Sequence, residues 1–480
     1  MGTARRVGPA RWAARGAAIT IATSLAAGAA RAESLPAHPA VGGPGATDVT
    51  AIELRPVRGA WRSLAWDDLE GLSLEPGDYE VRAAFEASGD VQALQVPPCA
   101  GRKRVSLDGL GLAPSAGPVV AAVRGGAHRV VVEVAVSRYE RRIACGERLH
   151  VGPVVQTAEG LATLEFQSPH GARGGGRAVV YLPPGHDRAR PGPLLVGTHP
   201  WNGSMWTYAA YAALLREAKA RDVVLLMPSG LGNSLYTADA EDEVLRAIEA
   251  LSQDVAIDRR RVSIWGASMG GAGATTIGLH NPDRFATITS FFGDSRYDLS
   301  TYVRSILGDE RGAHLVNALD VADNARNLAV WLVHGEDDRT SPILQSELLA
   351  DALARRGFPV RFDRVASTGH SGALVTRVLP EVVALAATTR TPDATRVTYR
   401  SVSDGQRGAY GVSLVRASRS ADAFVDVERL ADGVHVHAAE GVRAVELAPG
   451  ALGTSPDGPR PPIVLDDARL GVPVVWGAPR

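Results

Sequence analysis

A single serine between two glycines is the residue in this chain best placed to act as a nucleophile. The apolar stretch Val262–Trp265 predicts a β-strand, Gly266-Ala267-Ser268-Met269-Gly270 follows it, and the small residues that come next are typical of a helix start. Glycine has no Cβ, so the strand and the helix can approach each other closely while Ser268 adopts a strained backbone conformation. Such a turn exposes the serine hydroxyl at the top of a parallel sheet.

A nucleophilic serine needs a base to take its proton, and that base needs a carboxylate to orient it. The apolar run Leu328–His334 predicts a second strand, and three adjacent acids, Glu336–Asp338, follow its end. A third predicted strand, Arg361–Val365, leads into the loop that contains His370. The chain order is therefore Ser268, then an acid, then His370, with each group just after a strand.

This order resembles that of the α/β-hydrolases. The motifs that carry the resemblance are Gly266–Gly271 with the following Asn281–Ala286, His334-Gly335 with Asp338, and Gly369-His370. They are most similar to the secreted branch that contains prolyl-oligopeptidase-type hydrolases, polyhydroxyalkanoate depolymerases, and feruloyl and acetylxylan esterases. The resemblance covers about residues 160–387, roughly half of the chain.

The resemblance implies a role for each residue of a catalytic triad. Ser268 would attack an acyl carbonyl, and His370 would take the serine proton and later give it to the leaving group. In the related motif the acid stands three positions after the glycine that ends the strand, which is Asp338 here. That residue would orient the imidazole, whereas Asp337 would form the turn. No cofactor is implied.

Two backbone N–H groups are expected to form the oxyanion hole. One belongs to Met269, the residue after the nucleophile. Many relatives have His-Gly after the buried strand Pro193–His199, but here proline follows His199, and proline has no N–H to donate. The second donor is therefore expected to be the N–H of Trp201. The same segment carries an aromatic row, Trp201, Trp206, Tyr208 and Tyr211. Part of this row must be helix core, and the other part, for which Trp206 and Tyr208 are the candidates, is expected to form a wall for an aromatic or sugar-bearing substrate.

The first residues have the pattern of a targeting segment. Arginines precede a small and apolar run, 16–30, and Ala30-Arg31-Ala32 fits the small-x-small cleavage pattern. We therefore predict a signal peptide over residues 1–32 and a secreted or periplasmic protein. A membrane anchor is the alternative, although the run is short and alanine-rich beside the ~20 residues that a span needs. The export route stays open.

The chain beyond residue 32 is too long for one ordinary domain. Alternating apolar residues and turns over 33–154 predict a β-sandwich-like module, residues 155–388 the α/β-hydrolase domain, and residues 389–480 a β-rich module. The predicted fold class is thus α/β: a doubly wound, mostly parallel sheet flanked by two smaller all-β, sandwich-like modules.

Three other groups of residues are assigned structural roles. Cys99 and Cys145 are the only cysteines, and in an exported protein they are expected to form a disulfide, with two buried thiols as the alternative. His435 and His437 share one face of a predicted strand, where an exposed face is favoured over a metal pair because no third ligand is evident. Glu241–Glu243 are expected to be solvated in the first turn of a helix over 240–251.

The composition excludes some classes of partner and leaves three functions open. With 45% hydrophobic residues, 21% charged residues and a net charge of −1, the chain is not suited to nucleic acid or an anionic membrane surface as its main partner. The favoured function is hydrolysis of small-molecule or polymer carboxylic esters, including plant-wall and carbohydrate-linked ones. A prolyl-oligopeptidase-type peptidase is the alternative, but the residues between the leader and the hydrolase are too few for a propeller of several blades. The third is an inactive binding or adhesion protein.

Overall fold

The computed structural model describes most of the chain after residue 46. The described residues are 11–12, 39–41, 46–87, 92–97, 99, 103–112, 118–136, 138, 141–143, 145, 148–152, 154–156, 160–171, 175–201, 203, 205–299, 307, 310–467 and 471–477. Apart from residues 11–12, the predicted signal peptide lies outside this set. None of the described helices is both long enough and apolar enough to cross a membrane.

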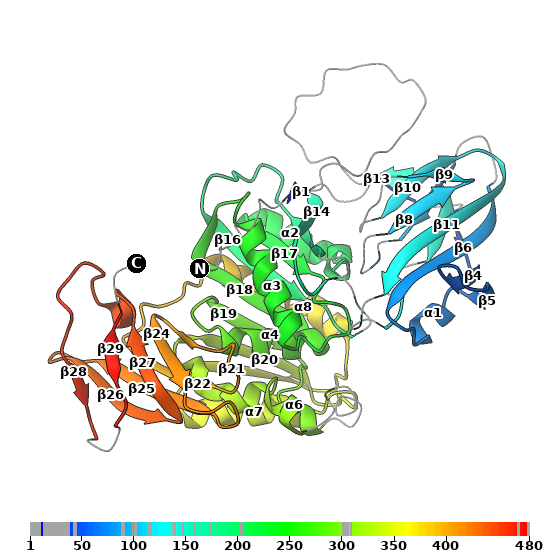
Figure 1. The fold of residues 1–480 in the computed structure, drawn as a ribbon. Coiled ribbons are helices and arrows are strands. Elements are labelled where there is room, and N and C mark those ends of the chain that lie inside the picture. Colours follow the sequence, from blue (N-terminus) through cyan, green and yellow to red (C-terminus); the bar gives the residue numbers. More distant parts are fainter. Residues whose placement is uncertain are drawn as a thin grey trace, which may run out of the picture. The chain divides into compact units, whose positions relative to one another are not determined.

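The chain divides into two compact units, which we describe separately. The first comprises residues 1–191, 199–234 and 239–256, and the second residues 192–198, 235–238 and 257–480. The described elements of the first unit include a β-sandwich at its N-terminal end (Figure 1, blue to cyan). One sheet has the order β10 (Val119–Val123), β7 (Gln92–Val96), β12 (Leu149–Gly152), β3 (Thr47–Val49). The other has the order β5 (Arg62–Ala65), β4 (Ala51–Pro56), β6 (Gly77–Ala87), β11 (Gly126–Val136), β8 (Arg104–Leu107), β9 (Leu110–Gly111).

The sandwich forms because one face of each long strand is apolar. In β6 and β11, Tyr79, Val81, Val130 and Val132 point inward and alternate with more exposed residues, as the period of two in the sequence predicts. They pack with residues of the first sheet in one core. Smaller elements accompany the sandwich: α1 (Asp68–Gly71) and the paired strands β2 (Pro39–Val41) and β13 (Val154–Gln156).

A disulfide between Cys99 and Cys145 links two segments of this sandwich, as the sequence predicts. Both cysteines are buried and belong to the same apolar core. The bond closes a chain segment of 46 residues.

The remainder of the first unit holds neighbouring antiparallel strands in the order β1 (Arg11–Trp12), β14 (Leu161–Gln167), β15 (Gly175–Tyr181), β17 (Val224–Pro228). Its helical segments include η2 (Tyr208–Ala210), α2 (Ala212–Arg221) and most of α3 (Ala238–Leu251).

One expectation fails in α3. Glu243 is not solvated but fully buried, where Ser168 Oγ donates a hydrogen bond to its Oε2. Burial raises the pKa of Glu243 above its ordinary value, although the bond from Ser168 opposes that effect. The sequence predicts a helix start at residue 240, and α3 begins at Ala238. Helical periodicity does not show that the segment with Ser168 packs over the first turn of this helix.

The second unit contains the parallel strands that the catalytic prediction needs. They lie in the order β16 (Gly192–Thr198), β18 (Ile257–Ala267), β19 (Thr287–Phe291), β20 (Ala329–Gly335), β21 (Val360–Val365). Helices α4 (Met269–His280) and α8 (Gly372–Thr388) pack on β16, β18 and β19, and α7 (Leu344–Arg355) packs on β20 and β21. The described residues between β19 and β20 include the short helical segments η3 (Tyr297–Leu299), α6 (Glu310–His314) and η4 (Ala318–Asn327). The parallel sheet and the separate antiparallel modules confirm the predicted fold class.

The described C-terminal residues form a second sandwich (Figure 1, orange to red). One sheet has the order β22 (Arg396–Ser401), β25 (Ala423–Arg429), β26 (Val434–Glu440), β28 (Ile463–Leu465). The other has the order β23 (Gly408–Ala409), β24 (Val412–Arg416), β27 (Val442–Leu447), β29 (Val474–Trp476), with η5 (Ala451–Gly453) nearby in sequence. Their inward faces share one core.

Polar contacts join this sandwich to the helical part of the second unit. The hydroxyl of Tyr399 donates to the carbonyl of His280 at 2.8 Å, and that of Tyr410 donates to the carbonyl of Pro282 at 2.7 Å. Asn324 in η4 accepts a hydrogen bond from the Arg400 N–H at 2.6 Å. The C-terminal sandwich is therefore attached through directional bonds as well as packing.

Candidate active site

Ser268 occupies a strained turn between β18 and α4. Its φ of 57° and ψ of −123° lie outside the regions that non-glycine residues prefer, at a cost of about 1–3 kcal/mol. The N–H of Ser268 donates to the carbonyl of Phe291 at 2.9 Å, and its carbonyl accepts from the N–H of Ala272 at 3.0 Å. The flanking strand and helix thus hold the serine in a conformation that it would not adopt alone.

The turn is crowded enough to require glycine beside the serine. A Cβ on Gly266 would lie 2.4 Å from the carbonyl oxygen of Gly270 and 2.4 Å from Thr198 Oγ1. A Cβ on Gly271 would lie 2.7 Å from the carbonyl oxygen of Phe291. Neither distance is compatible with a side chain, so the glycine pattern in the sequence has a steric cause here.

Asp338 is the one of the three adjacent acids that contacts His370. His370 Nδ1 donates to Asp338 Oδ2 at 2.7 Å. The other oxygen, Oδ1, accepts from the backbone N–H groups of Thr340 at 2.9 Å and Ser341 at 3.0 Å. Asp338 is buried, whereas Glu336 and Asp337 are exposed.

The surroundings of Asp338 keep it ionised. Burial alone would raise the pKa of Asp338, but hydrogen bonds from His334, His370 and the Ser341 N–H hold that pKa well below its ordinary value. An ionised carboxylate on Nδ1 leaves the other imidazole nitrogen of His370, Nε2, free to accept a proton.

Residues 232–384 match the model of the prolyl oligopeptidase family, and this segment contains Ser268, Asp338 and His370. The part of the chain that contains the parallel strands is an α/β-hydrolase of the serine hydrolase type. The family resemblance predicted from the motifs is confirmed. No curated protein matches the sequence of this hydrolase.

Several solved structures resemble the hydrolase at low sequence identity. An S-formylglutathione hydrolase from Agrobacterium tumefaciens is 19% identical, with 49% of this chain and 98% of that chain covered and a TM-score of 0.43. A ferulic acid esterase is 16% identical, with 47% and 96% covered and a TM-score of 0.40. Dipeptidyl peptidase 4 from Porphyromonas gingivalis is 16% identical, with 48% and 35% covered and a TM-score of 0.39. At these values the likeness does not discriminate between substrates.

Further buried polar groups support the loop that holds Asp338. His334, the penultimate residue of β20, is fully buried, and its Nδ1 lies 2.7 Å from Ser346 Oγ while its Nε2 lies 2.8 Å from the carbonyl of Ser341. Ser341 Oγ donates to Asp294 Oδ1 at 2.5 Å. These bonds fix the loop 338–341 whose N–H groups hold Asp338. Sequence reasoning recognised His334 only as part of a motif, and it did not single out Asp294 or Ser341.

Phe292 is a further residue of the site that sequence reasoning missed. Its ring centroid lies 4.3 Å from that of His370, and its N–H donates to the carbonyl of Val333 at 2.9 Å. The φ of Phe292 is 41°, a left-handed conformation unusual for an aromatic residue. The only signal in the sequence was its position directly after a strand of the parallel sheet.

The two residues expected to supply the oxyanion N–H groups, Met269 and Trp201, lie in separate segments of the chain. Met269 is the first residue of α4, directly after Ser268. Trp201 lies in a turn soon after β16, where the N–H of Gly203 donates to the carbonyl of Pro200 at 2.9 Å. His199 is buried with its two ring nitrogens 2.9 Å from the carbonyls of Pro200 and Ser229, so it is placed as a structural residue of this loop.

The expected aromatic wall needs a correction. Tyr208 is only 1% exposed and packs edge-on against Tyr211, with 5.6 Å between the ring centroids. Its side chain is therefore part of the packed interior and cannot line a substrate surface in this structure. Trp206 is partly exposed. An aromatic row in the sequence could not show which of its members face inward.

Proposed function

We propose that this hydrolase cleaves carboxylic esters through an acyl-enzyme formed on Ser268. The observation that carries the proposal is the hydrogen bond between Asp338 and His370. These two residues follow β20 and β21, which run parallel to β18, the strand that leads into the strained Ser268. The carboxyl ends of parallel strands lie at one edge of their sheet, which is where such enzymes react.

The reaction would proceed in two steps. His370 Nε2 takes the proton of the Ser268 hydroxyl while the serine oxygen attacks the ester carbonyl, and the same imidazolium then protonates the departing alkoxide. In the second step His370 takes a proton from water while the water oxygen attacks the acyl carbonyl. The imidazolium then returns this proton to the Ser268 oxygen as the bond to the acyl group breaks and the acid is released. Asp338 stabilises the imidazolium in both steps through its bond with Nδ1.

Backbone donors would stabilise the oxyanion that forms in each step. We assign one to the N–H of Met269, because the residue after the nucleophile begins α4. We assign the second to the N–H of Trp201, because Pro200 has none. Each such donor is worth about 3–4 kcal/mol of barrier in comparable enzymes. Trp206 remains our candidate for contact with the acyl or alcohol group.

Two observations favour an ester over a peptide. The described residues from 46 to 152 form a two-sheet sandwich, an architecture unlike the propeller that restricts access in peptidases of this type. In addition, an alkoxide leaves more readily than an amine and depends less on protonation by His370. Polymer, plant-wall and carbohydrate-linked esters are the substrates we would test first. The match to the prolyl oligopeptidase family supports a peptidase as the second candidate.

Two experiments test the proposal in sequence. Labelling with a fluorescent fluorophosphonate should modify the wild-type chain and not the Ser268→Ala variant, and an unlabelled wild type would favour an inactive binding protein. A panel of acetyl, butyryl, feruloyl and proline-containing peptide substrates should then show a higher kcat/KM for the esters. An equal or higher kcat/KM for the peptides would replace the esterase by a peptidase.

We also propose that the chain is exported and loses residues 1–32, and that the mature protein has modules over 33–154, 155–388 and 389–480. The arginine-rich start, the apolar run and the Cys99–Cys145 disulfide support export. N-terminal sequencing of protein recovered outside the cytoplasm should begin at Glu33. Recovery only as a full-length cytoplasmic chain would contradict this.

A further inference from the structure

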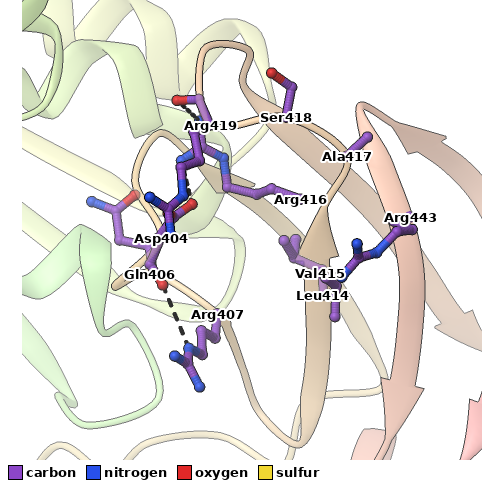
Figure 2. Close-up of a pocket in the computed structure, with 10 residues that line it drawn as sticks. All are labelled: Asp404, Gln406, Arg407, Leu414, Val415, Arg416, Ala417, Ser418, Arg419 and Arg443. Carbon is purple, nitrogen blue, oxygen red and sulfur yellow. Dashed lines mark hydrogen bonds and ion pairs between the residues drawn. The ribbon is translucent and has the colours of Figure 1, made fainter.

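The C-terminal sandwich contains a pocket of about 580 Å³ that the proposed reaction does not use. It lies between the segment 404–407, the end of β24 with its following turn, and β27. Four arginines line it, against one carboxylate, that of Asp404. Figure 2 shows Arg407, Arg416, Arg419 and Arg443 around this pocket, with dashed lines that connect three of them to Asp404.

Arg416 is the innermost of these arginines. Its side chain is only 7% exposed. Nη2 donates to the carbonyl of Ala421 at 2.6 Å, Nη1 lies 3.4 Å from Asp404 Oδ1, and the buried Nε has no hydrogen-bond partner among the described residues. A guanidinium removed from water normally has its charge compensated and its donors satisfied, and this one has neither in full.

Asp404 cannot compensate the charge of the pocket. Its Oδ2 pairs with Arg419 Nε at 2.9 Å, so the carboxylate is shared between Arg419 and Arg416. Arg407 bonds only the backbone carbonyl of Asp404 at 3.4 Å, and within the described part of the chain neither Arg407 nor Arg443 makes an ion pair with an acid. Four positive charges therefore face one negative charge, which attracts anions.

The pocket is built to hold more than a bare ion. Leu414 and Val415 provide an apolar side to the lining, and the volume falls in the range of sites for small organic molecules. The turn that carries Arg419 is also fixed from outside, since Arg311 Nη2 of α6 donates to the carbonyl of Arg419 at 2.9 Å. The backbone of this turn is thus held in position before any ligand arrives, and the buried side chain of Arg416 is held by its bond to the carbonyl of Ala421.

We propose that this pocket binds a small organic anion with two or more negative charges, carried by a phosphoryl group or by several carboxylates. Guanidinium forks match the oxygen geometry of both groups, and several arginines favour a multiply charged ligand over a single carboxylate. The ligand's anionic end contacts Arg416 and Arg443, and its remaining atoms lie against Leu414 and Val415.

Titration calorimetry of the purified full chain at low ionic strength tests the proposal. The probes are glucose 6-phosphate, citrate, inorganic phosphate and, as the neutral control, glucose. We expect glucose 6-phosphate or citrate to bind more tightly than inorganic phosphate, and we expect glucose not to bind. Tighter binding of glucose 6-phosphate would identify a phosphoryl group as the ligand's charged end, and tighter binding of citrate would identify several carboxylates. The proposal is overturned if neither organic anion binds at about 10 mM, a concentration that nearly fills a site with a Kd of about 1 mM.

Variants assign the binding to the pocket. Arg443→Gln should weaken binding at least about tenfold, in line with the loss of one charge-assisted contact. Because Arg443 makes no ion pair with a described residue, the Arg443→Gln variant should fold normally. The Arg416→Gln variant should weaken binding further, but it also removes the hydrogen bond from Arg416 to the carbonyl of Ala421. Arg429→Gln is the matched control, since that arginine lies outside the lining and bonds the carbonyl of Gly453 at 2.7 Å. An unchanged Kd in Arg443→Gln, or equal weakening in the control, would locate the anion elsewhere.

Labelling of the same variants keeps this inference separate from the esterase proposal. Fluorophosphonate modification of Ser268 should be as fast in Arg443→Gln as in the wild type. Loss of labelling together with loss of anion binding would mean that the substitution disturbs the whole chain and would count against a separate site.

Discussion

The ring of Phe292 packs against the ring of His370 with 4.3 Å between centroids, on a backbone turn with a φ of 41°. His370 is therefore positioned by two contacts of different kinds. The hydrogen bond that its Nδ1 donates to the Asp338 carboxylate fixes its tautomer, and the aromatic ring of Phe292 limits the tilt of its own ring. Phe292 itself is held by its bond to Val333 of the neighbouring strand β20.

Replacing Phe292 should disturb this orientation without removing a reacting group. We expect Phe292→Ala to lower kcat by about 10- to 100-fold, because small misplacements of a catalytic group are costly. KM should change less, and fluorophosphonate labelling should slow but persist. Phe424→Ala, which removes a phenyl ring in the C-terminal sandwich that stacks with Arg400, is the control for general loss of stability and should leave kcat unchanged.

Asp338→Asn should be far more damaging than Asp337→Asn. Both N–H bonds to Oδ1 require an oxygen, so the amide nitrogen of an asparagine would have to face His370 Nδ1. That arrangement forces the wrong imidazole tautomer, and a loss of about 10⁴ in kcat is expected. Asp337 is exposed and its replacement should cost little. Steady-state kinetics with an aryl ester, after matching the melting curves of the two variants, measures the difference; the opposite ranking would refute our choice of acid.

Loss of the disulfide should weaken the N-terminal sandwich. The Cys99→Ala/Cys145→Ala double variant should lose about 2–4 kcal/mol in its free energy of unfolding, as expected for a closed segment of 46 residues. Urea unfolding with a probe in the sandwich measures this loss, and esterase kinetics should be little affected. Mass analysis after alkylation with and without reductant supplies the control, and two free thiols in native exported protein would contradict the bond.

His314 should make the attachment of the C-terminal sandwich depend on pH. Burial alone lowers the pKa of His314, but hydrogen bonds with Asp422 and Asp320, each 2.9 Å from a ring nitrogen, raise the net pKa above its ordinary value. A raised folded-state pKa stabilises the protein below the ordinary value of about 6.5 and loses that contribution as the pH rises through the folded-state pKa.

Urea unfolding of the wild type and of His314→Gln at two pH values isolates this contribution to the free energy of unfolding. The destabilisation caused by His314→Gln should be larger at about pH 5.5 than at about pH 9, because the wild-type ion pairs exist only when the imidazole is charged. A destabilisation that is the same at both pH values would exclude a charged His314 as the cause.

The sequence predicted the parts of the molecule that depend on local pattern. Ser268 and Asp338 each follow an apolar run that forms a buried strand, whereas His370 follows the edge strand β21, which alternates charged with apolar residues and is only partly buried. Parallel strands bring their carboxyl ends to one edge of the sheet. Local pattern could not predict whether another segment of the chain buries a given side chain. Glu243 was expected in water and is buried against Ser168, and Tyr208 was expected at a surface and packs on Tyr211. Arg443 joins the three other arginines near Asp404 only through strand pairing, since it lies on β27 and Arg416 lies on β24.

The backbone of Ser268 also limits how this lineage can change. Glycine would adopt a φ of 57° without strain, so a glycine at position 268 would relieve about 1–3 kcal/mol at an entropic cost of about 0.5–1 kcal/mol. Selection for stability alone would therefore favour glycine over the serine that we propose as the nucleophile. A serine is kept at this position only as long as catalysis is under selection, and a descendant that drifted to glycine would have to cross a stability barrier to regain it.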